Sequence, residues 1–192
     1  MRYIIHFALL FSLCSTQAFA NGTQQVELIV FRQDNASLPV SQLAPDQWAQ
    51  GATLITSQLQ RSTQLDYLAK KLTPDSGYEV LLHQTWLQHS QDATAKVAVM
   101  AGPARFEHYP VEGSLTFSLA RNNKVQLDLW FNQFNPDQTL LSSERFKHRA
   151  TVANDQVTFI DHYPFGALIR IQPQRTQASP TPNRANHAED FE

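Results

Sequence analysis

The chain has little cysteine, no excess of positive charge and no glycine-rich phosphate loop. Its one cysteine is Cys14, and 15 basic side chains stand against 17 acidic ones, a formal net charge of −2. The lack of a basic excess argues against nucleic-acid binding. Without a phosphate loop, neither phosphoryl transfer nor dinucleotide-dependent redox chemistry is expected. The seven histidines form no His-x-His or His-Glu-x-x-His pattern, so the sequence predicts no metal site and no cofactor.

The apolar run at the start of the chain is too short to cross a membrane. It covers residues 4–13, well short of the roughly 20 residues that a spanning helix needs. With Arg2 before it and a small-x-small site ending at Ala20, it predicts a secretory signal peptide (1–20) that is cleaved after Ala20. A lipoprotein site at Cys14 is the alternative, although Leu13 is bulky where that signal has a small residue. We therefore expect an exported protein with no cysteine and no membrane span once mature.

Short apolar or alternating segments, separated by turn residues, predict a mostly antiparallel sheet. The clearest is a hairpin in which apolar and polar residues alternate over 114–119 and 124–131, joined at Asn122-Asn123. Further strands are expected at 26–31, 78–88, 95–100, 140–152, 157–161 and 167–171. One apolar and one polar face is the pattern of an antiparallel sheet that is covered on a single side.

One helix is expected after a long polar connection over 33–60, which carries a short helical turn around Trp48. Thr63-Gln-Leu-Asp66 has the spacing of a capping box, and the helix would end before Pro74. Its apolar side chains share one face (Leu65, Leu68 and Leu72). We therefore predict an α+β fold, a single domain over 21–173 in which the sheet packs on this main helix. Residues 174–192 are polar apart from Phe191 and predict a disordered tail.

The segment 159–173 places Asp161-His162 before a Pro164-Phe-Gly166 turn and a strand that ends at Pro173. Pro164 presets φ, and Gly166 is expected to supply the backbone freedom for a sharp reversal. Asp161 and His162 have three possible roles: a turn held by local hydrogen bonds, a ligand contact, or an acid-base pair. The turn role is favoured, because no nucleophile accompanies the pair.

This segment resembles the closing block of the CsiV-type peptidoglycan-binding family, periplasmic proteins of Gram-negative bacteria. Three further blocks occur in the family's order: residues 26–32, the Tyr-x-Val-Leu-x-His-x-x-Trp pattern over 78–88, and residues 111–121. The sequence departs from the family at Tyr163, which stands where the family has proline. The resemblance implies a periplasmic protein that binds peptidoglycan without cleaving it and supports envelope integrity.

Three aromatic residues are candidates for sugar binding, because sugar rings stack on exposed aromatic faces. Trp130 lies on the polar face of its strand with Gln126 and Asp128 and is the best platform, followed by Trp86 and Tyr163. The alternative is that a covering segment buries Trp130 and that Trp86 belongs to the core, as tryptophan usually does.

Three basic residues alternate along one expected strand: Arg145, Lys147 and Arg149. With period two they share one face, where they could bind the carboxylates of peptidoglycan stem peptides through charge-assisted hydrogen bonds. The alternative is a solvated strand face that prevents aggregation.

The sequence shows no catalytic centre, so we expect a binding protein and not an enzyme. Four carboxylates are available for glycosidic cleavage, and the sequence marks none as part of a pair (Glu112, Asp128, Glu144 and Asp161). Two rivals remain: an interaction protein that docks on wall-synthesis or wall-cleaving enzymes without binding peptidoglycan directly, and a hydrolase or amidase with an unrecognised site.

Overall fold

The computed structural model describes residues 23–33, 42–89, 94–118 and 123–174. The expected signal peptide, Asn122 of the expected hairpin turn and residues 175–192 of the expected tail lie outside these ranges. The strands are β1 (Thr23–Gln33), β2 (Thr53–Leu54), β3 (Tyr78–His89), β4 (Ala95–Ala101), β5 (Val111–Ser118), β6 (Asn123–Phe134), β7 (Leu140–Val152), β8 (Val157–His162) and β9 (Phe165–Pro173). In the described part of the chain, no helix is long and apolar enough to cross a membrane.

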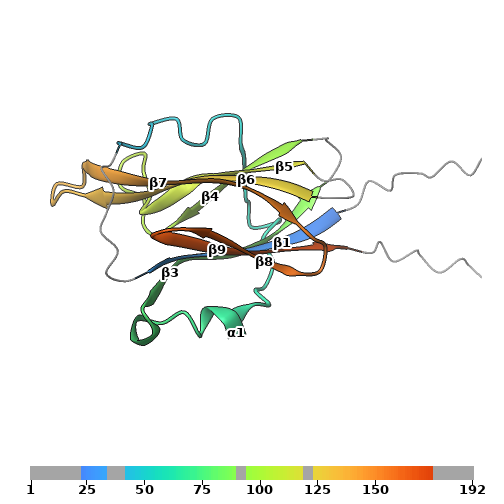
Figure 1. Ribbon diagram of the computed structural model, residues 1–192. Coiled ribbons are helices and arrows are strands. Elements are labelled where there is room, and N and C mark those ends of the chain that lie inside the picture. Colours follow the sequence, from blue (N-terminus) through green and yellow to red (C-terminus); the bar gives the residue numbers. More distant parts are fainter. Residues whose placement is uncertain (1–22, 34–41, 90–93, 119–122, 175–192) are drawn as a thin grey trace, which may run out of the picture.

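The strands form two sheets that pack face to face (Figure 1). One sheet has the order β3-β1-β9-β8, with every neighbouring pair antiparallel. The other has the order β2-β4-β5-β6-β7 and is antiparallel except for the short β2–β4 pair. The expected antiparallel strands are thus confirmed, but they divide into a β-sandwich instead of a single sheet.

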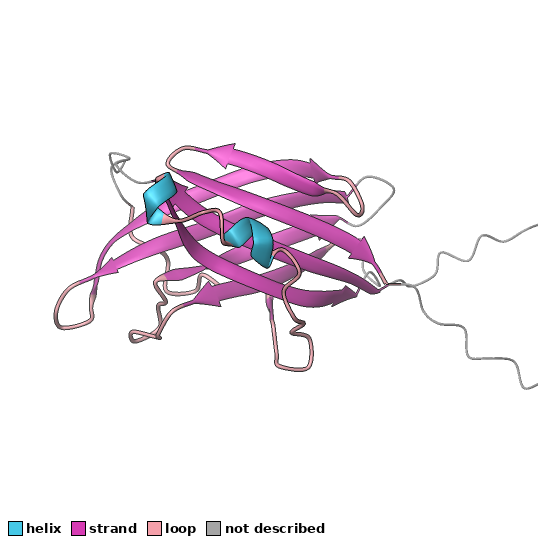
Figure 2. Cartoon of the chain, turned by 90° about the horizontal axis from the view of Figure 1, so that it is seen from below, coloured by secondary structure: helices cyan, strands magenta, loops and turns pink. Residues whose placement is uncertain are grey.

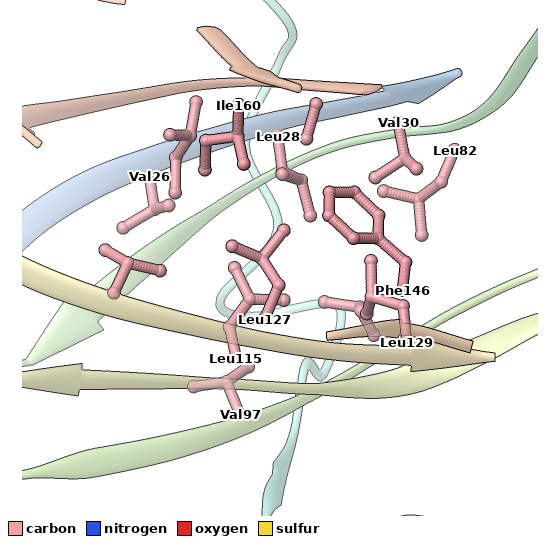
Figure 3. Close-up of a cluster of buried hydrophobic side chains, with 14 of the residues drawn as sticks. Val26, Leu28, Val30, Leu82, Val97, Leu115, Leu127, Leu129, Phe146 and Ile160 are labelled. Carbon is pink, nitrogen blue, oxygen red and sulfur yellow. The ribbon is translucent and has the colours of Figure 1, made fainter. Parts of the chain in front are cut away.

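The core lies between the sheets and follows from strand alternation. Val26, Leu28 and Val30 point inward from β1, opposite Leu127 and Leu129 of β6 (Figure 3). Aromatic rings fill one end, where Phe131 and Phe165 stack with centroids 3.9 Å apart. The chain therefore buries its apolar surface sheet against sheet and needs no helix to cover it.

The expected main helix is absent from the described residues. In its place are α1 (Asp66–Ala69), a single turn, and a 3-10 turn, η1 (Pro74–Ser76). The capping box predicted at Thr63 does not form, since the helix has Leu65 at its N-cap and no side-chain cap of its own. A helix confined between Thr63 and Pro74 is too short to be stable without tertiary support. The α+β prediction is therefore wrong in its helical part.

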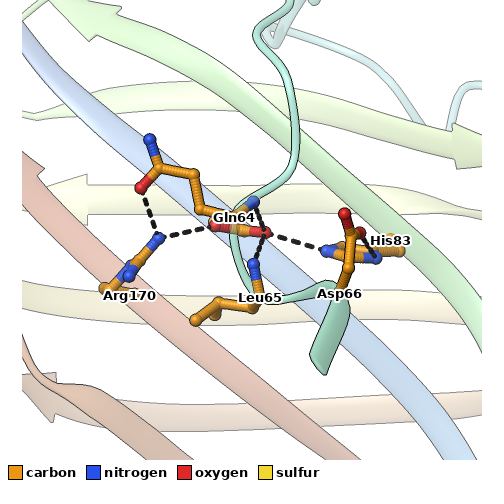
Figure 4. A network of polar contacts seen from close by, with 6 residues as sticks. Gln64, Leu65, Asp66, His83 and Arg170 are labelled. Carbon is orange, nitrogen blue, oxygen red and sulfur yellow. Dashed lines mark hydrogen bonds and ion pairs between the residues drawn. The ribbon is translucent and has the colours of Figure 1, made fainter. Parts of the chain in front are cut away.

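A buried carboxylate on β1 holds this segment against the outer face of the four-stranded sheet (Figure 4). Glu27, only 1% exposed, accepts hydrogen bonds at Oε1 from the backbone N–H groups of Gln64 (2.8 Å) and Leu65 (2.7 Å). The same carboxylate contacts His83 Nε2 at 2.9 Å and Arg170 Nη2 at 2.9 Å. Glu27 thus accepts from the N-cap residue Leu65 and from the residue before it, as the N3 carboxylate of a capping box accepts from the N-cap N–H.

A second segment, residues 42–54, crosses the outer face of the five-stranded sheet (Figure 1). At one end the Ala44 N–H donates to Ser143 Oγ of β7 (2.9 Å), and at the other Lys96 Nζ of β4 donates to the Gln50 carbonyl (2.7 Å). The expected turn around Trp48 is present, and its indole N–H donates to the Glu107 carbonyl at 3.1 Å. Both outer faces are therefore partly covered by the long connection between β1 and β3.

Gly166 has a different role from the one its sequence context predicts. It lies inside β9, while the turn itself consists of Tyr163 and Pro164, which are joined by a cis peptide bond. A Cβ atom at Gly166 would lie 2.5 Å from Phe31 Cζ and 3.2 Å from Phe159 Cε2. The glycine is required because two aromatic rings lie directly over it, not because the backbone reverses there.

Candidate functional site

The three basic residues of β7 share the outer face of the five-stranded sheet. Arg145, Lys147 and Arg149 are all exposed, while the intervening Phe146 is fully buried between the sheets. On the neighbouring strand β6 they lie opposite Trp130, Asp128 and Gln126, respectively. We call this surface the basic face: Arg145, Lys147 and Arg149 of β7 with Lys124, Gln126 and Asp128 of β6.

Asp128 compensates the charge at one end of the basic face. It accepts two hydrogen bonds from Arg145, Nε to Oδ1 at 2.7 Å and Nη2 to Oδ2 at 2.8 Å. These hydrogen bonds raise the pKa of the Arg145 guanidinium above its usual value. Lys147 Nζ lies 3.8 Å from the same carboxylate. A second anion therefore meets a partly neutralised surface at this end.

The positive charge at the other end is not compensated in this way. Arg149 Nε donates to the neutral Gln126 Oε1 at 2.8 Å, and among the described residues neither Arg149 nor Lys124 forms an ion pair. Both side chains line a shallow depression of about 340 Å³. Its other polar walls come from β5, β6 and β7 (Thr116, Ser118, Gln126 and Thr151). This end combines uncompensated positive charge with several hydroxyl groups, which suits a carboxylate-bearing ligand.

Neither candidate tryptophan offers an open ring. Trp130 is 6% exposed, and the Arg145 guanidinium lies 4.9 Å from its ring centroid as a cation–π contact. Trp86 is 1% exposed, packs edge-on against Phe117 and donates its indole N–H to Gln88 Oε1 at 3.3 Å. The structure therefore agrees with the alternative of burial for both residues. Neither indole ring has a face that is open for stacking on a sugar.

The residues of the Asp161-His162-Tyr163 segment lie apart from the basic face. The His162 ring stacks on Phe146, with centroids 5.2 Å apart and planes within 9°, and meets His148 edge-on. Phe146 and His148 alternate with the basic residues of β7, so His162 is on the opposite side of that strand. Tyr163 is 61% exposed in the turn that follows. The predicted residues thus form two separate groups, not one constellation.

Comparison with known families agrees with the resemblance seen in the sequence. A sequence model of a family described as "Peptidoglycan-binding protein, CsiV" matches residues 56–174. The chain belongs to the CsiV family. The match runs from just after β2 to the end of β9 and contains the whole basic face, whereas the block at 26–32 lies outside it. No curated protein and no solved structure gave a significant match.

The four candidate carboxylates lie in different surroundings. Glu112 is fully buried, with Oε1 lying 2.6 Å from His108 Nδ1 and accepting a 2.8 Å hydrogen bond from Asn132 Nδ2. Asp128 is occupied by Arg145, Glu144 is 5% exposed and Asp161 is exposed on β8. The described residues contain no group of three or more side chains that could hold a metal ion.

Two surface residues of interest were not among the sequence candidates. Lys124 lies on the same face of β6 as Gln126 and Asp128. The alternation of that strand in the sequence was therefore enough to place Lys124 on the basic face. Phe159 is 55% exposed on β8 although its strand pattern predicts no particular exposure. Its position depends on Phe31 and Gly166, which come from other strands.

Glu144 provides a pH-dependent test of the packing between the sheets. Burial raises the pKa of its carboxyl above the ordinary 4.5, and nearby Arg32 opposes that rise. A raised folded-state pKa means that the unfolded chain ionises first, so stability is lost as the pH rises from 4.5 through the folded-state value. We expect Glu144→Gln to gain stability relative to the unmodified chain at pH 7 and much less at pH 4, measured by urea unfolding.

The exposed Glu107→Gln variant is the control for this experiment, since that side chain is at the surface. If Glu144→Gln changes the free energy of unfolding equally at the two pH values, the Glu144 carboxyl does not have a raised pKa in the folded protein.

Proposed function

We propose that the protein is a non-catalytic, periplasmic peptidoglycan-binding protein that supports the integrity of the cell envelope. The observation that carries this proposal is the match to the CsiV family over residues 56–174. A binding role also fits Asp128 and Glu112, which are held by Arg145 and by His108. The exported form would begin after cleavage at Ala20, with its domain over 21–173.

The basic face is the proposed site for the acidic stem peptides of peptidoglycan. Arg145, Lys147 and Arg149 would bind their carboxylates, with Lys124 completing the row. Within the row, Arg149 and Lys124 carry most of the attraction, because Asp128 already occupies the Arg145 guanidinium. Asp161, His162 and Tyr163 are proposed as a separate contact at the β8–β9 turn.

Reversing the two uncompensated charges tests the basic face most cleanly. We expect Lys124→Glu/Arg149→Glu to bind purified, protein-free sacculi at least about tenfold more weakly, because each charge-assisted hydrogen bond contributes about 1.5–3 kcal/mol. Co-sedimentation at low and at moderate salt measures the loss, and binding by the unmodified chain should weaken as salt rises. Arg145→Glu is less informative, since it would place a second carboxylate beside Asp128.

The matched control is Lys70→Glu/Lys71→Glu, which makes the same change in net charge at exposed positions beside α1. If both double variants lose binding equally, the effect is one of overall charge and the basic face is not the site. If neither loses binding, the electrostatic part of the proposal fails.

The second candidate is a protein that docks on wall enzymes without binding the wall itself. It is favoured by two exposed apolar side chains, Leu43 (55%) and Phe106 (75%), which line a hollow of about 440 Å³ at the end of the five-stranded sheet. Exposed apolar surface of this kind often marks a protein interface. A pull-down of partner enzymes that survives complete digestion of the wall, together with no binding to purified sacculi, would favour this alternative.

A further inference from the structure

The outer face of the four-stranded sheet keeps an uncovered aromatic surface at β8. The segment with α1 lies over this sheet at β1 and β9, where the Gln64 and Leu65 N–H groups donate to Glu27 and Arg170 Nη2 donates to Gln64 Oε1 (Figure 2). Just before it, residues 59–61 pair with the free edge of β3, where Arg61 N donates to the Thr85 carbonyl. β8 is the edge strand beyond these contacts. There Phe159 is 55% exposed and Asp161, two residues along the strand, is exposed as well. Phe159 and Asp161 therefore lie on the same outward face of β8.

The Phe159 ring is supported from below and from the side. It stacks on Phe31 with centroids 6.2 Å apart and planes within 10°, and Phe31 itself is 4% exposed and packs edge-on against Tyr78. Both rings lie over Gly166, where any side chain would collide with them. We call this surface the aromatic ledge: Phe159, Phe31 and Gly166, flanked by Asp161. Because its ring is already held in place, a ligand that stacks on it loses little conformational entropy on binding.

The electrostatics of the aromatic ledge differ from those of the basic face. Arg170 of β9 is paired with Glu27 at 2.9 Å, and Arg32 of β1 is paired with Glu79 at 2.7 Å. Asp161 adds a negative charge on the ledge itself. The surface therefore disfavours acidic stem peptides and suits an uncharged ligand that offers hydroxyl or amide donors and an apolar ring face.

We propose that the aromatic ledge binds the N-acetylated sugar rings of the glycan strand. A sugar ring would stack on Phe159, and Asp161 would accept hydrogen bonds from its hydroxyl or amide groups. This inference rests on the proposed peptidoglycan-binding function. It assigns the two parts of peptidoglycan, the sugars and the stem peptides, to two different faces of the protein. Sugars bind the four-stranded sheet, and stem-peptide carboxylates bind the basic face of the other sheet.

The test uses the full mature chain and a neutral probe, the hexamer of N-acetylglucosamine, in parallel with purified sacculi. We expect Phe159→Ala to weaken hexamer binding about threefold to tenfold, the range that follows from the loss of one aromatic stacking contact. Phe159→Trp should restore or tighten binding, since it keeps a flat ring at that position. The control is Leu141→Ala, which removes another exposed apolar side chain, on β7 of the other sheet, and should leave hexamer binding unchanged.

The outcomes separate this inference from the proposed function. If the unmodified chain binds sacculi but not the hexamer, or if Phe159→Ala binds the hexamer as tightly as the unmodified chain, the aromatic ledge is not a sugar site and the proposed function stands. If the unmodified chain binds neither sacculi nor the hexamer, both proposals fail. Urea unfolding of each variant shows whether weaker binding reflects lost stability, and Phe159→Trp keeps the test decisive if Phe159→Ala is unstable.

Discussion

Replacing Glu27 by alanine is expected to lower the free energy of unfolding by about 3–5 kcal/mol, the usual cost of removing one partner from a buried charged network. The carboxylate is 1% exposed and serves four donors, two backbone N–H groups and the side chains of His83 and Arg170. Removing it leaves Arg170 with Gln64 as its acceptor and leaves the Gln64 and Leu65 N–H groups just before α1 without theirs. Urea unfolding followed by tryptophan fluorescence measures the change, because Trp86 in the core reports loss of the fold.

A matched glutamate on the neighbouring strand provides the control. Glu79 also pairs with an arginine, Arg32 at 2.7 Å, but both side chains are substantially exposed, 47% and 33%. Glu79→Ala should therefore cost less than about 1 kcal/mol, as surface ion pairs do. Equal losses for Glu27→Ala and Glu79→Ala would show that the buried network does not hold the segment over residues 60–72.

The strands could be predicted because their signal is local. Alternation in the sequence placed a strand over 140–152, and β7 is Leu140–Val152; the strand expected over 78–88 is β3, Tyr78–His89. Each of these patterns needs only the period of two that a half-buried strand imposes. Alternation also put Arg145, Lys147 and Arg149 on one face, which the structure confirms, although their ligand-binding role stays a prediction.

The division into two sheets could not be predicted, because it depends on pairing between distant segments. β1 pairs with β3 on one side and with β9 on the other, so the first and last described strands are neighbours. The burial of Glu27 has the same origin. In the sequence it is a polar residue in an apolar strand, and only the segment over residues 60–72 removes it from water.

The burial of the candidate tryptophans could not be decided from the sequence for a related reason. The alternation of β6 correctly assigned Trp130 to the polar face, but it could not show that the Arg145 side chain would lie over the indole ring. Phe159 was overlooked because its exposure and support depend on Phe31 and Gly166 from β1 and β9. Sequence periodicity assigns a side chain to a face, whereas exposure on that face is decided by neighbours that are distant in the chain.

Gly113→Ala is the second change for which we expect a large loss, at least about 3 kcal/mol from backbone strain and overpacking together. Gly113 has φ of +148°, and a Cβ atom there would lie 2.3 Å from the Asp128 carbonyl oxygen and 2.7 Å from Leu129 Cα. Both obstacles are backbone atoms of β6, so no side-chain rotation relieves the clash and the β5–β6 pair must separate. Urea unfolding measures the cost.

The control is Gly51→Ala, which separates strain in φ from the collision with β6. Gly51 also has a positive φ of +70°, yet a Cβ atom added there would have nothing within 4 Å of it. It should therefore cost only about 1–2 kcal/mol, the penalty for a left-handed L-residue. Because Lys124 and Gln126, which positions Arg149, also lie on β6, the Gly113 variant should bind sacculi more weakly even in conditions where it remains folded. Normal binding by a folded Gly113→Ala variant, or equal destabilisation of the two variants, would show that β6 accommodates the added methyl group without moving the basic face.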